Sequence, residues 1–403
     1  MLPAIVFHGD IVASHTCTAY LWATMTWIII IIVVHLLIIY GALLVYYRQG
    51  WLGIPVVSGL SSVAQTKITV IIPARNEEAN IKVCLDSITA QSYPKELFEI
   101  IVVDDFSADN TAAIVSQYPN VQLISLKDFV ADKINSYKKK AIEIAIQHSK
   151  GELIVTTDAD CVVPKNWLQT IASFYEKEKP AFIAMPVLIS SGGKFIEIFQ
   201  ALDFMTLQGI TGASVNKKFH SMCNGANLAY TKQVFYEVDG FKGIDNIASG
   251  DDMLLMHKIF ERYPDKIKFL KSQDVIVKTN PVQSVKEFFN QRIRWASKAD
   301  KYNDKRILPV LILVYFLNVM MLILPFILLF DDPSFLMIEV CILLFVLKIL
   351  IEVFFLYPVA TFFCSKKLLR RFPIAQPFHI AYTVIAGWLG KFGSYKWKDR
   401  QVK

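Results

Sequence analysis

The chain has 403 residues, a formal net charge of +7 and a composition in which 54% of residues are hydrophobic. This apolar share exceeds that of an average soluble domain and is concentrated at the two ends, so we expect a soluble domain flanked by membrane segments. The six cysteines show no CxxC or other paired spacing, which argues against a zinc site or a disulfide framework. Lys and Arg gather near the apolar segments, which favours anionic lipid headgroups over nucleic acid as their partner.

The first apolar segment, residues 21–47, is longer than the roughly 20 residues that a helix needs to cross a bilayer. Trp and Tyr side chains stand near both of its ends, as in the aromatic belts of membrane proteins. Residues 1–20 carry no Lys or Arg, so we expect them on the extracytoplasmic side. A cleaved signal peptide is the alternative, but the segment is too long and no basic region precedes it. The Gly- and Ser-rich residues 49–66 are expected to form a linker.

Four unbroken apolar runs then alternate with helical patterns, which indicates a parallel sheet covered on both faces. The expected strands are residues 67–73, 99–104, 121–126 and 153–157. The expected helices between them are residues 76–89, 110–117 and 138–148. Ligands of such sheets bind beyond the carboxyl ends of the strands, and polar residues of this chain cluster at those ends.

The carboxyl-terminal half contains further helical patterns and two more apolar segments. Residues 195–215 predict either a core helix or an amphipathic helix on the membrane surface. Residues 285–302 predict a basic helix, and residues 307–330 and 335–363 predict membrane spans. Basic residues follow the second of these spans, so the positive-inside rule places the central domain in the cytosol, at a plasma or inner membrane.

The last apolar stretch, within residues 372–403, contains Pro and ends in a basic tail. We interpret it as an interfacial or re-entrant segment, with a fourth span as the alternative. Within the preceding span, Lys348 and Glu352 lie four residues apart on one helix face, where we expect them to neutralise each other.

The chemistry of the chain centres on Asp158-Ala159-Asp160, which follows an apolar strand pattern. Two carboxylates one residue apart at a strand end supply the oxygen ligands that Mg²⁺ prefers. Taken alone, such a pair is also compatible with an ordinary solvated turn.

Six motifs in order resemble the catalytic domain of glycosyltransferase family 2, which has the GT-A fold. They are PARNEEANI, VVDDFSADNT, KKKAIEIAI, TTDADCVVP, SGDDMLL and QRIRW, and they span residues 67–302. The flanking spans resemble those of membrane-integrated members such as ceramide glucosyltransferases and cellulose or hyaluronan synthases. The resemblance implies an α/β, Rossmann-like, mostly parallel sheet and metal-assisted, inverting transfer of a sugar from a nucleotide sugar, with UDP expected.

The resemblance also implies roles for individual residues at the strand ends. Asp160 would be the more direct ligand of Mg²⁺ or Mn²⁺, with Asp158 beside it and closer to the donor sugar and ribose. Asp104 and Asp105 would recognise uracil. The other wall of the nucleotide pocket would consist of Pro73, Ala74, Arg75 and Glu77, although Glu77 is equally explained as a first-turn helix charge.

Further along the chain the match is less complete. The family carries Gly-Lys where this chain has Lys138 in the Gly place, which leaves either Lys139 or Lys140 as the donor-binding lysine. Asp252 is the candidate general base, and Asp251 replaces a usual Glu beside it; an acidic helix start is the alternative. The loop residues Asn224, Gly225 and Ala226 are assigned to the acceptor side.

The QRIRW motif supplies Gln291, Arg294 and Trp295. Trp offers a flat face for a sugar ring, and Arg offers a fork for diphosphate oxygens. The same helix is also compatible with a lipid-headgroup anchor, and we assign Arg292 to that role.

We therefore expect an enzyme that uses a lipid or lipid-linked acceptor, because the QRIRW helix leads almost directly into a membrane span. A processive polysaccharide synthase of the same family is the main alternative, and a non-catalytic membrane scaffold is a more distant one. The sugar, the acceptor and the oligomeric state do not follow from the sequence.

Overall fold

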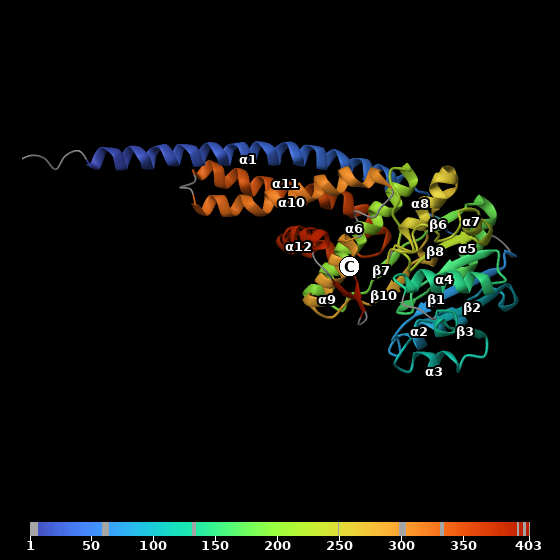
Figure 1. Cartoon of the computed structure of the whole chain (residues 1–403). Coiled ribbons are helices and arrows are strands. Elements are labelled where there is room, and N and C mark those ends of the chain that lie inside the picture. Colours follow the sequence, from blue (N-terminus) through green and yellow to red (C-terminus); the bar gives the residue numbers. More distant parts are fainter. Residues whose placement is uncertain are drawn as a thin grey trace, which may run out of the picture.

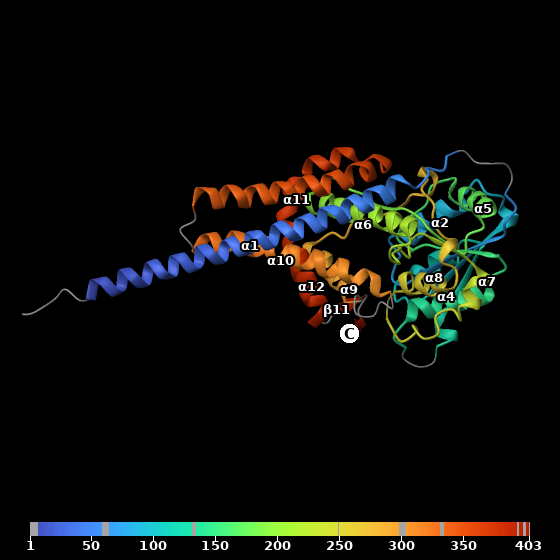
Figure 2. The ribbon, with the colours of Figure 1, turned by 90° about the horizontal axis from the view of Figure 1, so that it is seen from above.

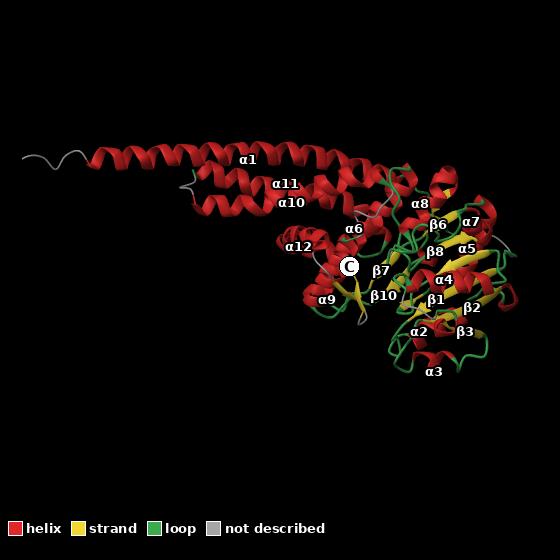
Figure 3. Ribbon diagram, viewed as in Figure 1, coloured by secondary structure: helices red, strands yellow, loops and turns green. Residues whose placement is uncertain are grey.

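The computed structural model describes residues 7–58, 64–130, 134–248, 250–297, 304–330, 334–392, 395–397 and 400–402. An α/β domain occupies one end of the molecule, and long helices extend from it (Figure 1). Most strands lie together among shorter helices, whereas a short pair of strands near the C-terminus lies apart from them beside the helical part (Figure 3). The molecule thus consists of an α/β part and a part made of long helices.

The central sheet has seven strands in the order β3-β2-β1-β4-β8-β6-β9. The strands are β1 (Ile68–Ala74), β2 (Phe98–Asp104), β3 (Val121–Ser125), β4 (Leu153–Thr156), β6 (Phe182–Ala184), β8 (Leu228–Thr231) and β9 (Ile267–Phe269). All adjacent pairs are parallel except those that β8 makes with β4 and with β6. The first four strands match the predicted ones to within one residue at each end.

Side chains of these strands alternate between two hydrophobic cores, as the period of a strand requires. Ile71 and Ile101 pack on the side of α4 (Tyr137–His148). Val70 and Val102 pack on the opposite side, with α2 (Ile81–Thr89) and α5 (Trp167–Glu178). Because both faces are covered, the strands are apolar throughout, and polar groups are left to the strand ends.

A second, three-stranded sheet has the order β5-β10-β7, formed by β5 (Cys161–Val162), β7 (Val187–Ile189) and β10 (Val277–Thr279). Only four residues separate the end of β4 in the central sheet from the start of β5 in this small sheet. The chain leaves β10 for α9 (Val285–Ala296). Residues 158–160 and the start of α9 are therefore attached to the same small sheet.

Three helices are long and apolar enough to cross a membrane, judged over the residues that the structure describes. They belong to α1 (Phe7–Leu52), α10 (Leu308–Phe330) and α11 (Phe335–Phe362). Both views show α1 running alongside α10 and α11 (Figures 1 and 2). The fourth helix of this part, α12 (Phe372–Phe392), is not among the candidate spans and packs on α9 and α10.

Two boundaries of α1 differ from the expected ones. The helix already begins at Phe7, within residues predicted to precede it, and it continues to Leu52. Residues 49–52 are therefore not part of a linker. Trp51 is fully buried, and its ring packs against Phe269 and Phe362, so the end of α1 is fixed to the domain and to α11.

Helix α6 (Phe195–Lys217) is a core helix, which decides between the two predictions for this segment. Fifteen of its residues are buried, and it contacts α1, α11 and β7. A Cβ atom on Gly209 would lie 2.6 Å from Val359, and one on Gly212 would lie 2.8 Å from Trp51. These glycines let α6 approach the apolar helices α1 and α11 closely.

Several shorter elements also differ from the prediction. Helix α2 begins at Ile81 and not at residue 76, because Asn76 has a φ of 51° and starts a turn. Glu77 therefore lies before the helix. Helix α3 (Thr111–Val115) is shorter than expected, and α9 ends at Ala296. The predicted continuation of α9 through residues 298–302 lies outside the described residues. In the tail, β11 (Tyr395–Trp397) pairs antiparallel with β12 (Arg400–Val402).

The remaining helices are α7 (Lys232–Glu237) and α8 (Met253–Arg262). In the helical part, Lys348 donates to Glu352 over 2.6 Å, as the neutralisation argument predicts. Gln376 of α12 and Tyr40 of α1 complete this buried polar cluster. The cluster therefore connects α1, α11 and α12.

Candidate active site

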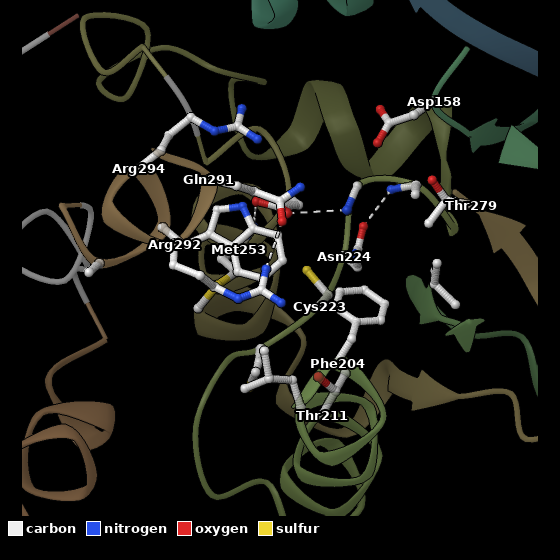
Figure 4. Close-up of a pocket in the computed structure, with 18 of the residues that line it drawn as sticks. Asp158, Phe204, Thr211, Cys223, Asn224, Met253, Thr279, Gln291, Arg292 and Arg294 are labelled. Atoms are coloured by element: carbon white, nitrogen blue, oxygen red, sulfur yellow. Dashed lines mark hydrogen bonds between the residues drawn. The ribbon is translucent and has the colours of Figure 1, made fainter. Parts of the chain in front are cut away.

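A single cavity of about 720 Å³ runs from the strand ends of the central sheet to the helices α10 and α12. Its polar end is lined by Asp158, Asp160, Asp251, Asp252, Lys138 and Asn224. Its other walls come from α6, α9, α10 and α12. In Figure 4, side chains of α9 lie on one side of this space, Asp158 and Thr279 lie across from them, and Phe204 and Thr211 of α6 form the floor.

The turn between β4 and β5 presents Asp158 and Asp160 to the cavity. Burial, and then the charges of Asp160 and Asp158, raise the pKa of the Cys161 thiol well above its ordinary value. The thiol therefore stays protonated, and it lies as a weak donor 3.5 Å from Oδ1 of Asp160. Asp158 and Asp160 thus line the same cavity, and the Cys161 thiol contacts the carboxylate of Asp160.

Lys138 is the lysine of the polar end. Its Nζ lies 2.7 Å from Oδ1 of Asp158 and 3.1 Å from Oδ2 of Asp251. Burial by itself lowers the pKa of Lys138, but the carboxylates of Asp158 and Asp251 outweigh it and raise the pKa above its ordinary value. A permanent positive charge thus stands between the two acidic loops.

Neither of the two lysines expected to bind the donor lines this cavity. Lys139 is buried, and its Nζ donates to the carbonyl oxygens of Ile244 and Ile247 at 2.6 and 2.8 Å. Lys140 pairs with Glu143 on the exposed side of α4. Successive helical residues point about 100° apart, so only one of the three lysines reaches the cavity, and it is the one in the place of the family's Gly.

Asp251 and Asp252 enter the cavity from the residues just before α8. Asp252 is the N-cap of α8: its Oδ1 accepts from the backbone N–H of Met253 at 2.7 Å. Its Oδ2 accepts from the N–H of Gly225 at 3.1 Å. The acidic helix start is therefore a correct description of the local structure, and the same carboxylate is also presented to the cavity. Asn224, Gly225 and Ala226 line the cavity beside it.

The predicted nucleotide wall is assembled in part. Pro73, Ala74, Arg75, Glu77 and Asp105 line the cavity. Arg75 donates to the carbonyl oxygens of Asp105 and Phe106, at 2.8 and 3.1 Å.

Asp104 does not line the cavity. It is the last residue of β2, it is buried, and its carboxylate accepts from the N–H of Ser107. Neighbouring side chains of a strand point to opposite faces, so Asp104 and Asp105 do not face the same space. Of the two residues expected to recognise uracil, only Asp105 lines the cavity.

Helix α9 contributes Gln291, Arg294 and Trp295 to the cavity wall, as the motif predicts. Arg292 also lines the cavity, and its side chain is only 4% exposed. Its guanidinium pairs with Asp203 of α6 and lies 4.1 Å from the centre of the Trp295 ring. The assignment of Arg292 to a headgroup anchor is therefore wrong: a buried side chain does not meet lipid headgroups.

Comparison with known proteins identifies the domain. Residues 69–238 match the model of the family described as "Glycosyl transferase family 2". Residues 69–238 therefore form a glycosyltransferase family 2 domain. The family, the enzyme class and the GT-A fold inferred from the six motifs are confirmed by this match and by a solved structure.

The similar structure is the mannosyltransferase PcManGT from Pyrobaculum calidifontis, solved in complex with GDP-Man and Mn²⁺. It aligns with a TM-score of 0.51 and 18% identity, covering 90% of this chain and 98% of the other. At that identity, the likeness concerns the fold. It extends over the helical part as well as the α/β domain, since it covers nine-tenths of this chain.

Among curated relatives, glycosyltransferase AglE of Haloferax volcanii is 35% identical over 192 residues, which cover 46% of this chain and 59% of the relative. The beta-monoglucosyldiacylglycerol synthase of Synechocystis sp. is 28% identical over 138 residues, which cover 33% of this chain and 28% of the relative. The chain therefore spans 59% and 28% of the length of these two relatives.

The acidic end fits a divalent cation that is shared with a donor. Within the described residues, no three His, Cys, Asp or Glu side chains form a closed metal cluster. Mg²⁺ in phosphate-transfer sites is usually held by one or two carboxylates together with substrate phosphates and water. Asp158 and Asp160 supply such carboxylates beside open space, so the donor set of this family 2 domain matches that arrangement.

Proposed function

We propose that this family 2 glycosyltransferase moves a sugar from a UDP-sugar to a hydroxyl group of a lipid or lipid-linked saccharide at the cytosolic face of a plasma or inner membrane. The observation that carries the proposal is the continuity of one cavity. The same 720 Å³ space is lined by Asp158 and Asp252 and by residues of two membrane-side helices. A lipid acceptor needs such a space, because its reacting hydroxyl and its chain differ completely in polarity.

The membrane-side walls of the cavity are mostly apolar. Helix α10 and the turn before it contribute Ile307, Leu308, Leu311, Ile312, Val314, Tyr315 and Phe316. Helix α12 contributes Tyr382, Thr383, Ala386, Gly387 and Lys391. Burying one methylene group of an acyl or prenyl chain contributes about 0.8 kcal/mol, so this wall favours a lipid over a free sugar as acceptor.

Asp252 has the position of a general base in this proposal. Its two oxygens are oriented by the N–H groups of Met253 and Gly225, and it faces the cavity beside Asn224. For inversion, one carboxylate must take the acceptor proton on the face opposite the leaving nucleotide. The negative charge of Asp251 is balanced by Lys138, which leaves Asp252 as the carboxylate of this pair without an ion pair to that lysine.

The donor would lie between the nucleotide wall and α9. Asp105 is the cavity-facing carboxylate for a base N–H, and Arg75 is fixed beside it. Arg294 and Lys138 bring positive charge toward the diphosphate. When bound at Asp160 and Asp158, Mg²⁺ or Mn²⁺ would neutralise charge that develops on the leaving diphosphate.

The test is nucleotide release from a panel of UDP- and GDP-sugars, with a membrane lipid extract as acceptor and mass spectrometry of the lipid product. We expect UDP release and a lipid that gains one sugar. Release of GDP would contradict the UDP assignment, and a product of many sugars would favour a polysaccharide synthase.

The base assignment is tested with Asp252→Asn. We expect transfer to fall by about 100- to 10,000-fold while UDP still binds, because general-base catalysis contributes typically that much. Asp86→Asn, on the exposed side of α2, serves as the matched control. Retained transfer in Asp252→Asn would exclude it as the base.

A further inference from the structure

Asp203 is a carboxylate in the middle of helix α6, and it is 7% exposed. Its Oδ2 accepts from Nε of Arg292 at 3.0 Å, and the second nitrogen of that guanidinium, Nη2, lies 2.7 Å from the same oxygen. The two residues are 89 positions apart in the chain. Two buried charges with this geometry hold α9 against α6 at the cavity wall.

The guanidinium of Arg292 makes its remaining contacts with the QRIRW motif itself. Its Nη1 donates to the side-chain oxygen of Gln291 over 2.8 Å, drawn as a dashed line in Figure 4. Its plane lies over the ring of Trp295, at 4.1 Å, and near that of Phe288, at 4.7 Å. One side chain thus determines the position of two others that line the cavity.

The other oxygen of Asp203 connects α12 to the same pair. The hydroxyl of Tyr382 donates to Oδ1 at 2.5 Å, and Nε2 of His379 lies 4.0 Å from it. Tyr382 itself lines the cavity. Asp203 therefore lies where α6, α9 and α12 meet, next to the cavity.

We propose that Asp203 is a positioning residue of the glycosyltransferase site. By fixing the guanidinium of Arg292, it sets the carboxamide of Gln291 and the indole of Trp295 for the donor sugar and diphosphate. The inference rests on the proposed function, because that function places the donor against α9.

The stability of the fold alone does not require the buried ion pair of Asp203 and Arg292. A buried ion pair contributes little net stability compared with apolar side chains of the same volume. The chain also has such a pair away from the cavity, Lys348 with Glu352, which joins helices but does not line it. Removing either pair should destabilise the fold, whereas only the pair at α9 should alter kinetic constants.

The experiment compares Asp203→Asn with the matched control Glu352→Gln in detergent-purified full-length protein. Melting temperature and the KM and kcat for the nucleotide sugar are measured for each. We expect both variants to melt at lower temperature. Only Asp203→Asn should raise the donor KM, by about 10-fold or more. Equal loss of melting temperature with an unchanged KM and kcat in both variants would overturn the positioning role.

Arg292→Lys and the double variant Asp203→Asn/Arg292→Lys provide a second readout. Lys keeps the charge but lacks the planar fork that contacts Gln291 and Trp295. We expect Arg292→Lys to raise the donor KM as much as Asp203→Asn does, and the double variant to be no worse than either. A wild-type KM in Arg292→Lys, or effects that multiply in the double variant, would contradict the proposal.

Different results would refute the proposed function and the positioning role of Asp203. A wild-type protein that releases no nucleotide from any sugar donor refutes the proposed function, and this inference with it. An active wild-type protein whose Asp203→Asn variant has unchanged kinetic constants refutes the positioning role alone.

Discussion

The ammonium group of Lys138 joins Asp158 to Asp251, with Nζ 2.7 Å from the first carboxylate and 3.1 Å from the second. These two acidic residues belong to different loops, one after β4 and one before α8. A Cβ atom on Gly225 would lie 3.1 Å from Asp251 and 3.2 Å from Nζ of Lys138, so the neighbouring loop leaves little room around this pair. The lysine therefore fixes the distance between the proposed metal-binding turn and the proposed base loop.

Replacing Lys138 with Met should lower kcat/KM by about 100-fold, in the range observed when one fixed electrostatic donor is removed from an active site. The loss follows because the two acidic loops then repel each other and the diphosphate loses a positive charge. Steady-state UDP release measures the effect. Lys140→Met is the control, since Lys140 lies outside the cavity, and an equal loss in both variants would contradict the assignment.

Replacing Asp160 with Asn should weaken the Mn²⁺ dependence of UDP binding and lower transfer by about 100-fold or more. An amide oxygen has no charge to offer a divalent cation, although it keeps the shape of the side chain. Calorimetric titration of UDP with and without Mn²⁺ separates this effect from misfolding. UDP affinity that responds equally to Mn²⁺ in the variant and the wild type would exclude Asp160 as a ligand.

Replacing Thr383 with Phe should narrow the membrane-side part of the cavity and raise the KM for a lipid acceptor by about 10-fold. Slow hydrolysis of the donor in the absence of acceptor should be unaffected, because Thr383 lies on α12 and not among the strand-end residues. Ile385→Phe, on the exposed side of α12, is the control. If lipid transfer is unchanged in Thr383→Phe, the acceptor chain does not use this wall.

Stability should depend on pH through His220. Burial lowers the pKa of His220 to about 4, while Nε2 lies 2.8 Å from the hydroxyl of Tyr47. The unfolded chain, with a pKa near 6.5, binds more protons between pH 6.5 and 4, so stability falls as pH decreases through that window. The expected loss is about 3 kcal/mol, and no such loss is expected above pH 6.5.

Melting temperatures of the wild type and His220→Phe from pH 7.5 to pH 4 test this prediction. As pH falls, the wild type should lose more stability than His220→Phe, because only the wild type contains the buried histidine. His148→Gln, which replaces an exposed histidine of α4, should follow the wild type. A pH-independent difference between His220→Phe and the wild type would disprove the linkage.

The parallel sheet, its strand ends and the three long apolar helices could be predicted from the sequence, because alternation of apolar runs and helix length are local properties. The choice among Lys138, Lys139 and Lys140 could not. It depends on the rotation of α4 about its axis, which packing on the sheet decides and three adjacent lysines do not reveal.

The same limit applies to Asp104 and Asp105, since which one faces the cavity depends on where β2 stops pairing with its neighbours. The partnership of Asp203 with Arg292 depends on tertiary structure across 89 residues. One sequence signal was present: a carboxylate within the helix predicted for residues 195–215 must find a partner when it is buried. Nothing in the sequence indicated which partner it finds.

The glycines of α6 have a consequence for how the enzyme meets its substrates. At Gly209 and Gly212 the helix backbone approaches α11 and the end of α1 too closely to leave space for a methyl group. Helix α6 of the α/β domain is therefore packed directly on the apolar helices α1 and α11, which could cross a membrane. Under the proposed function, an acceptor must reach the site by lateral diffusion in the leaflet, and the donor must come from the aqueous side.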